Sequence, residues 1–80
     1  MENLDKALCA LLLEHESLKE NERFISLQTN YLNKMKIIVD YGNDPLPVRD
    51  AKLAVLQAEL DYETQQHTVF LQGLLIKYSR

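Results

Sequence analysis

The sequence is poor in the residues that interrupt helices, form disulfides or build phosphate-binding loops. Its 80 residues include two glycines, two prolines and one cysteine. So little Gly and Pro excludes collagen-like, linker-like and low-complexity chains, and two glycines are too few for a loop that cradles phosphate. Cys9 cannot form a disulfide within the chain. We expect it to be a small packed side chain, because Lys6 is the only nearby base that would favour a reactive thiolate.

The chain also lacks a strong charge of either sign and a long apolar run. It has 12 acidic and 9 basic residues, for a net charge of −3. A weakly acidic chain without a basic cluster is a poor candidate for nucleic acid or an anionic membrane. The apolar run ALCALLL at residues 7–13 is much shorter than the roughly 20 residues of a membrane span. Because Glu2 and Asp5 precede it instead of the basic start of a signal peptide, we expect a cytoplasmic protein, and the sequence leaves open an export route without a cleaved signal.

Catalytic and metal-binding patterns are missing as well. His15 and His67 lie far apart, and the sequence contains no HxxxH, CxxC or His–carboxylate cluster at ligand spacing. Motifs of the GxGxxG, P-loop and GxSxG types are absent. We interpret the acidic stretch at residues 14–22 as a solvated helix face, because nothing nearby predicts a pocket that would shift its pKa values. The sequence therefore predicts a protein that is not an enzyme and uses no metal, cofactor or small-molecule substrate.

The residues that break helices are concentrated in one segment, GNDPLP at residues 42–47. Gly42 suits the left-handed position just past the end of a helix. Asp44 can cap the next helix, with Pro45 at its first position, where a missing N–H costs nothing. The alternative is a helix that starts at Asp50. The segment predicts a short connection between two helices near residues 42–48.

Upstream of this turn, residues 3–41 contain no Gly or Pro and show a seven-residue apolar period that predicts a helix. One row consists of Leu4, Leu11, Leu18, Ile25, Leu32 and Val39, and a second consists of Phe24, Tyr31 and Ile38. The stretch at residues 14–23 is polar except for Leu18, and Ser17 to Glu20 fits a capping box, which marks helix starts. The sequence leaves open whether residues 3–16 form a separate N-terminal helix or continue the first one.

Downstream of the turn, the second helix has apolar rows on two nearly opposite sides, at about 100° per residue. One side carries Leu46, Leu53, Leu60, His67 and Leu74, flanked by Leu56, Leu71 and Tyr78. The other side carries Val48, Val55, Tyr62, Val69 and Ile76, and Ala51 and Ala58 beside them would let another helix approach closely. A hairpin covers only one side, and each Val, Leu or Ile left in water forgoes roughly 1.5–3 kcal/mol. The second side could be covered by residues 3–15 folded back as a third helix, by another copy, or by a different protein.

Several segments together resemble a known family. They are Leu4 and Leu8, the run Leu11-Leu12-Leu13-Glu14, the turn at residues 42–45, and the leucines at 53, 56 and 60 leading to Leu74-Leu75-Ile76-Lys77-Tyr78. This layout resembles the small helical-hairpin co-chaperones of needle subunits in bacterial type III secretion systems (the YscE type). The resemblance implies a non-enzymatic protein that binds a second, repeat-helical chaperone and helps it hold the aggregation-prone needle subunit in the cytoplasm. It would assign the contact to Val55, Tyr62, Val69 and Ile76.

We therefore predict one all-α domain over residues 1–80, an antiparallel helical hairpin of about 18–41 and 46–78. The predicted hairpin core consists of Ile25, Leu32, Met35, Val39, Leu53, Leu56, Leu60, Leu71 and Leu74. The predicted partner-binding residues are Val48, Val55, Tyr62, Val69 and Ile76. The predicted function is that of an adaptor or co-chaperone in a hetero-complex. The alternative is a structural subunit, needle-like or coiled-coil, that forms a homo-oligomer through the same faces.

Overall fold

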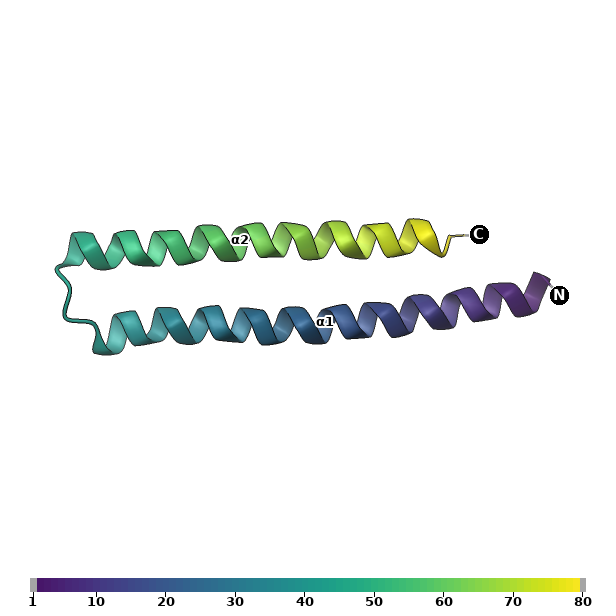
Figure 1. Ribbon diagram of the computed structural model, residues 1–80, viewed down its shortest axis with the longest axis horizontal. Coiled ribbons are helices and arrows are strands. Elements are labelled where there is room, and N and C mark those ends of the chain that lie inside the picture. The colour runs from purple at the N-terminus through teal and green to yellow at the C-terminus, as the bar shows by residue number, and fades with distance from the viewer. Residues whose placement is uncertain (1, 80) are drawn as a thin grey trace.

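The computed structural model describes residues 2–79, with the backbone alone described for Glu2. Helix α1 covers Glu2–Tyr41 and helix α2 covers Leu46–Lys77. The two helices run antiparallel and form a thin rod (Figure 1), with Cα extents of 65 × 17 × 7 Å. The prediction of an all-α antiparallel hairpin is confirmed. Because α1 is 40 residues long and α2 is 32, the start of α1 extends beyond the end of α2 (Figure 1).

Helix α1 is continuous through the polar stretch at residues 14–23. A separate N-terminal helix over residues 3–16 therefore does not form, and residues 3–15 do not fold back as a third helix. The capping-box residue Glu20 is not used to start a helix. Its carboxylate instead accepts hydrogen bonds from Arg23, one turn further along, and lies within hydrogen-bonding distance of His67 on α2.

The turn differs from the sequence-based expectation at both helix ends. Neither glycine has a positive φ, so the prediction of a left-handed Gly42 is wrong. The N–H of Gly42 donates to the carbonyl oxygen of Ile38 at 3.2 Å, and a Cβ on Gly42 would collide with that oxygen. Asp44 does not cap α2, which has no side-chain cap; its carboxylate pairs with Lys52 instead.

The two helices meet along one line of side chains, which we call the seam. Helix α1 contributes Leu13, Glu20, Phe24, Leu27, Tyr31, Met35 and Ile38, and α2 contributes Leu53, Leu56, Leu60, Glu63, His67, Leu71 and Leu74, all buried or half-buried. Among the residues whose side chains are described, only Leu60, Leu74 and Glu20 are buried, at 5–7% exposure. A two-helix rod therefore has a narrow interior, and most of its apolar side chains stay accessible.

The prediction that Ile25, Leu32 and Val39 belong to the hairpin core is wrong. They are 51–60% exposed, whereas Leu60 and Leu74 are buried and Met35, Leu53, Leu56 and Leu71 are half-buried. Helix α2 can cover only one of the two apolar rows of α1. It covers the row with Phe24 and Tyr31, which has Leu13 and Leu27 beside it and so forms a two-residue-wide stripe. The neighbours of the leucine row are largely polar, so packing against it would have buried less apolar area.

Candidate protein-binding surfaces

The first candidate surface runs along the outside of α2, on the side away from α1. Ala58 and Tyr62 lie two residues to either side of the buried Leu60, which places them about 160° around the helix from it. The five predicted partner-binding residues are exposed, from 43% for Val48 to 77% for Ile76. Together with four exposed residues that lie between them on the same side of α2, they form what we call the outer stripe. Its members are Val48, Ala51, Val55, Ala58, Tyr62, Gln65, Val69, Gln72 and Ile76. No member of the outer stripe is charged.

The second candidate surface is the leucine row of α1, made of Leu4, Leu11, Leu18, Ile25, Leu32 and Val39. These side chains are 51–67% exposed. At about 100° per residue, Leu32 and Ile37 lie on opposite flanks of the seam residue Tyr31. Ile37 lines a groove between the two helices, which Val48 and Val55 of α2 also line. The hairpin has two broad faces. The groove lies on one of them, and the leucine row lies on the other.

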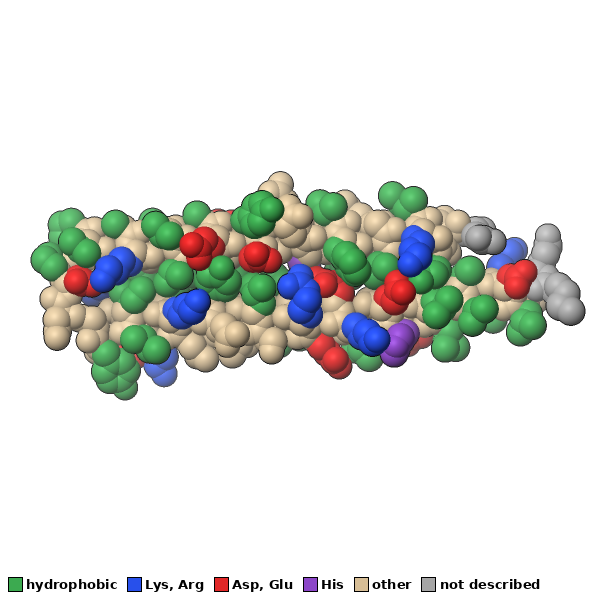
Figure 2. Space-filling view, viewed as in Figure 1, with side chains coloured by type: hydrophobic (Ala, Val, Ile, Leu, Met, Phe, Trp, Pro, Cys, Tyr) green, Lys and Arg blue, Asp and Glu red, His purple; other side chains and the backbone are tan. Residues whose placement is uncertain are grey.

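An apolar groove of about 770 Å³ lies between the helices near the turn. Ile37 and Ile38 of α1 form one wall, Val48, Val55 and Leu56 of α2 form the other, and Lys34 and Lys52 stand among them. Apolar side chains follow the junction of the helices at this end of the face drawn in Figure 2, and charged side chains are more frequent in its middle. Because Val48, Ala51 and Val55 belong to both, the groove is continuous with the outer stripe.

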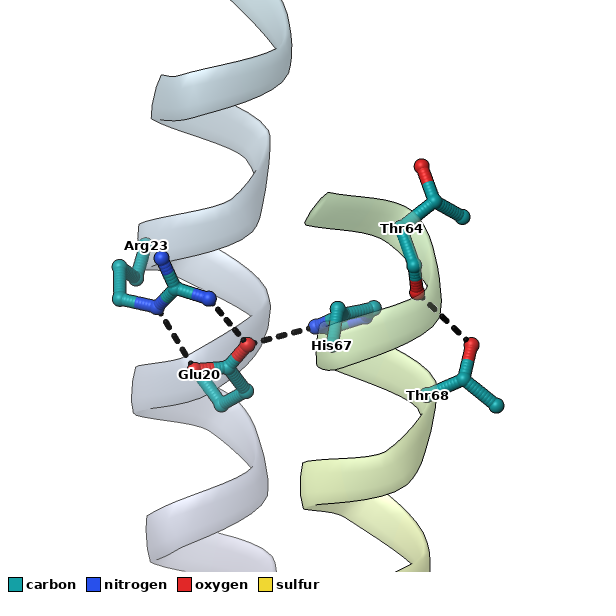
Figure 3. Close-up of polar contacts among 5 residues, drawn as sticks. All are labelled: Glu20, Arg23, Thr64, His67 and Thr68. Atoms are coloured by element: carbon teal, nitrogen blue, oxygen red, sulfur yellow. Dashed lines mark hydrogen bonds and ion pairs between the residues drawn. The ribbon is translucent and has the colours of Figure 1, made fainter. Parts of the chain in front are cut away.

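The part of the seam nearer the open end of the hairpin holds a buried polar cluster (Figure 3). Glu20 is only 7% exposed. Nε of Arg23 donates to its Oε1 at 2.8 Å, Nη2 donates to its Oε2 at 2.9 Å, and Nδ1 of His67 lies 2.7 Å from the same Oε2. The His67 ring also stacks on Phe24, with ring centroids 4.2 Å apart. The cluster joins α1 to α2 by a hydrogen bond and an aromatic stack at one point in the rod.

The electrostatics of this cluster favour a structural link rather than acid–base chemistry. The hydrogen bonds from Arg23 lower the pKa of Glu20 to about 2, with His67 acting in the same direction and burial opposing both. At neutral pH Glu20 is therefore an ionised acceptor, and Nδ1 of His67 must carry a proton to bond to it. A general base works best with a pKa near the operating pH, which Glu20 does not have.

Sequence reasoning missed this cluster, because Glu20 was included in a stretch interpreted as solvated. The signal was nevertheless present in the seven-residue period. Glu20 lies seven residues from both Leu13 and Leu27, and His67 lies seven residues from both Leu60 and Leu74. Each therefore stands between two leucines of its own row. Cys9 and His15, which the sequence analysis also considered, take no part in the cluster. Cys9 is half-buried near the start of α1, and His15 is exposed.

Other kinds of site find no support in the part of the chain that is described. Within residues 2–79, no group of three or more His, Cys, Asp or Glu side chains is placed to hold a metal ion. Neither α1 nor α2, as far as they are described, includes a segment long and apolar enough to cross a membrane. Comparison of the chain with family models, with curated proteins and with solved structures gave no match. The two apolar surfaces are therefore the features on which a function can be argued.

Proposed function

We propose that this chain is a non-enzymatic adaptor or co-chaperone that binds another protein through the outer stripe of α2. The observation that carries the proposal is the alignment of Val48, Val55, Tyr62, Val69 and Ile76 on the side of α2 that α1 leaves open, all of them exposed. Each apolar side chain of this size gains roughly 1.5–3 kcal/mol when it is fully buried. An exposed stripe in which seven of the nine side chains are apolar is typical of an interface.

The partner that best fits this stripe presents an apolar, concave or helical surface of its own. The outer stripe carries no charge, so its recognition depends on shape and apolar area rather than on ion pairs. The resemblance to the needle-subunit co-chaperones supports a repeat-helical chaperone as the partner, in a cytoplasmic complex that holds a secretion needle subunit. On this proposal the chain has no substrate and no contact with nucleic acid or membrane.

The test is the loss of partner binding when a charge is placed in the outer stripe. Val55→Asp and Val69→Asp should both stay helical by circular dichroism, because both side chains are exposed. Both should fail to copurify the protein that the wild-type chain captures from its native cell and that rebinds it when purified. Asn33→Asp is the matched control, since Asn33 is exposed on α1 and belongs to neither apolar surface. Retention of the partner by both stripe variants would refute the assignment.

The second candidate function is a structural subunit that assembles with itself. The observation that favours it is the leucine row of α1, because a chain with apolar surfaces on two different helices can add copies on both sides. Repeated contacts that do not close produce open filaments. This candidate predicts particles that keep growing with protein concentration in the absence of any partner, whereas the adaptor forms a complex of fixed composition.

A further inference from the structure

The outer stripe has the pattern of a helix–helix seam in its own right. Its nine members are separated by alternating steps of three and four residues, from Val48 to Ile76. This is the spacing that lets two helices pack along their whole length. Bulky side chains occupy the first position of each seven-residue unit, and Ala51, Ala58, Gln65 and Gln72 occupy the second. The small alanines allow a second helix to approach closely.

We infer that the outer stripe binds the same stripe of a second copy, with the two α2 helices antiparallel, in a closed two-fold dimer. The alternation of sizes is self-complementary in this direction. When the two-fold axis passes between Glu63 and Thr64, Val69 of one copy lies opposite Ala58 of the other, and Ile76 lies opposite Ala51. In the same register Tyr62 meets Gln65 and Val55 meets Gln72. A parallel pair would instead set each alanine against an alanine and Tyr62 against Tyr62, leaving gaps beside overfilled layers.

The charges on either side of the outer stripe select this register. In it, Glu59 lies nearest Gln66 of the second copy, Asp61 nearest Thr68, and Lys52 nearest Gly73, so no like charges meet. Sliding one helix by seven residues, to the neighbouring register with the same packing, places Glu59 against Glu59 and Asp61 against Asp61. Like charges across an interface are unfavourable. Sliding one helix seven residues the other way brings no like charges together but leaves only residues 57–77 of the two α2 helices overlapping, whereas the chosen register overlaps residues 50–77, about 42 Å of helix at 1.5 Å per residue.

The dimer uses the surface that the adaptor needs, so the two complexes compete. This point rests on the proposed function; the existence of the dimer does not. A second copy on the outer stripe covers Val48, Ala51 and Val55, which also line the groove near the turn. The leucine row lies on the opposite face and stays open. Dissociation of the dimer must therefore precede binding of the partner through α2.

The direction and register can be tested by disulfide cross-linking of the full chain with Cys9→Ala. One preparation carries Ala58→Cys and another carries Val69→Cys, and each is oxidised alone and as an equal mixture. In the antiparallel dimer residues 58 and 69 face each other, whereas each is separated from its own counterpart by about 16 Å along the axis, too far for a disulfide. Cross-linking should occur mainly in the mixture. Cross-linking of the Ala58→Cys preparation by itself would show a parallel pair and overturn the inference.

Solution mass tests the dimer itself. Light scattering over a concentration series should show the wild-type mass rising from 9.3 kDa to twice that value and no further. Ala58→Glu should remain monomeric at every concentration and keep its helicity, because Ala58 is exposed and Glu is a good helix former. Ala10→Glu, the same change at an exposed alanine of α1, should dimerise like the wild type.

Each contrary result has a definite meaning. A wild-type chain that stays monomeric throughout, or an Ala58→Glu chain that still dimerises, overturns the dimer and leaves the adaptor proposal standing. A mass that keeps rising overturns the closed dimer in favour of an open assembly. The adaptor proposal fails on a different observation, the retention of the captured protein by both Val55→Asp and Val69→Asp.

Discussion

At the scale of single residues, Glu20 contributes more than its place in an acidic stretch indicates. It is buried, ionised and bonded across the seam. Its pKa lies at about 2 in the folded chain, below the ordinary value of 4.5. A carboxyl group with a lowered pKa adds stability that is fully present above its unfolded pKa and is lost as the pH falls through its folded pKa. This contribution should therefore disappear between about pH 4.5 and pH 2.

The corresponding experiment compares thermal unfolding of the wild type and Glu20→Gln over that pH range. Glu20→Gln should be less stable at pH 7 by about 1–3 kcal/mol, because it weakens hydrogen bonds to a charged, buried group. The difference between the two proteins should shrink as the pH approaches 2. Glu22→Gln is the matched control, since Glu22 is exposed on the same helix. A constant difference from pH 7 to pH 2 would show that the ionised form of Glu20 has no special role.

The choice between the two apolar rows of α1 is also decided residue by residue. Leu60→Ala should destabilise the hairpin by about 2–5 kcal/mol, because Leu60 is 7% exposed and its loss leaves a gap in the seam. Leu32→Ala should cost no more than about 0.5 kcal/mol in the monomer, since Leu32 is 54% exposed. Urea unfolding of both variants measures the two losses of stability. Both are made in the Ala58→Glu chain, which is expected to be monomeric. Comparable losses would place Leu32 back in the core.

The sequence could not resolve this choice, because both rows of α1 have the same seven-residue period. What separates them is which row α2 contacts, and that depends on neighbours such as Leu13 and Leu27 that complete a wider stripe. The outer stripe was easier to predict. Val48, Val55 and Tyr62 are placed by helical geometry opposite Leu60 as soon as α2 is one helix, and a single neighbouring helix cannot reach both sides.

At the scale of elements, the two helices and the turn follow from where Gly and Pro occur, but the detail of the turn does not. Residues 42–47 end α1 and begin α2 at the predicted place. The ends are held differently from the expectation, by the Asp44–Lys52 pair and by the close approach of Gly42 to Ile38. These contacts depend on how the chain reverses direction in space, which local propensities do not determine.

The two glycines should consequently respond in opposite ways to the same substitution. Gly42→Ala should destabilise the hairpin by more than about 1 kcal/mol, because the new Cβ collides with the carbonyl oxygen of Ile38 and the turn must shift. Gly73→Ala should stabilise it by about 1 kcal/mol, because Gly73 lies inside α2 and an added Cβ would meet nothing within 4 Å. Denaturant unfolding of the two variants makes the comparison. Equal effects of the two substitutions would contradict the described turn.

At the scale of the whole molecule, the rod has a small interior for its length. Only three of the described side chains are buried, and the start of α1 has no helix beside it (Figure 1). Small domains with so little buried surface are marginal when they stand alone. Both the proposed partner and the inferred second copy add the apolar burial that the hairpin cannot provide for itself. The stability of this chain should therefore depend on its own concentration.

Binding of a second copy to the folded form, and not to the unfolded form, raises stability by mass action. The melting temperature of the wild type should rise with protein concentration over a roughly hundredfold range, since occupancy of the outer stripe rises with it. Ala58→Glu should melt at the same temperature throughout, because its stripe carries a charge that the dimer must bury unpaired. Differential scanning calorimetry at the two ends of the range separates these outcomes. A wild-type melting temperature that does not change with concentration would mean that the seam alone stabilises the hairpin. The outer stripe would then bind a different protein and not a second copy of this chain.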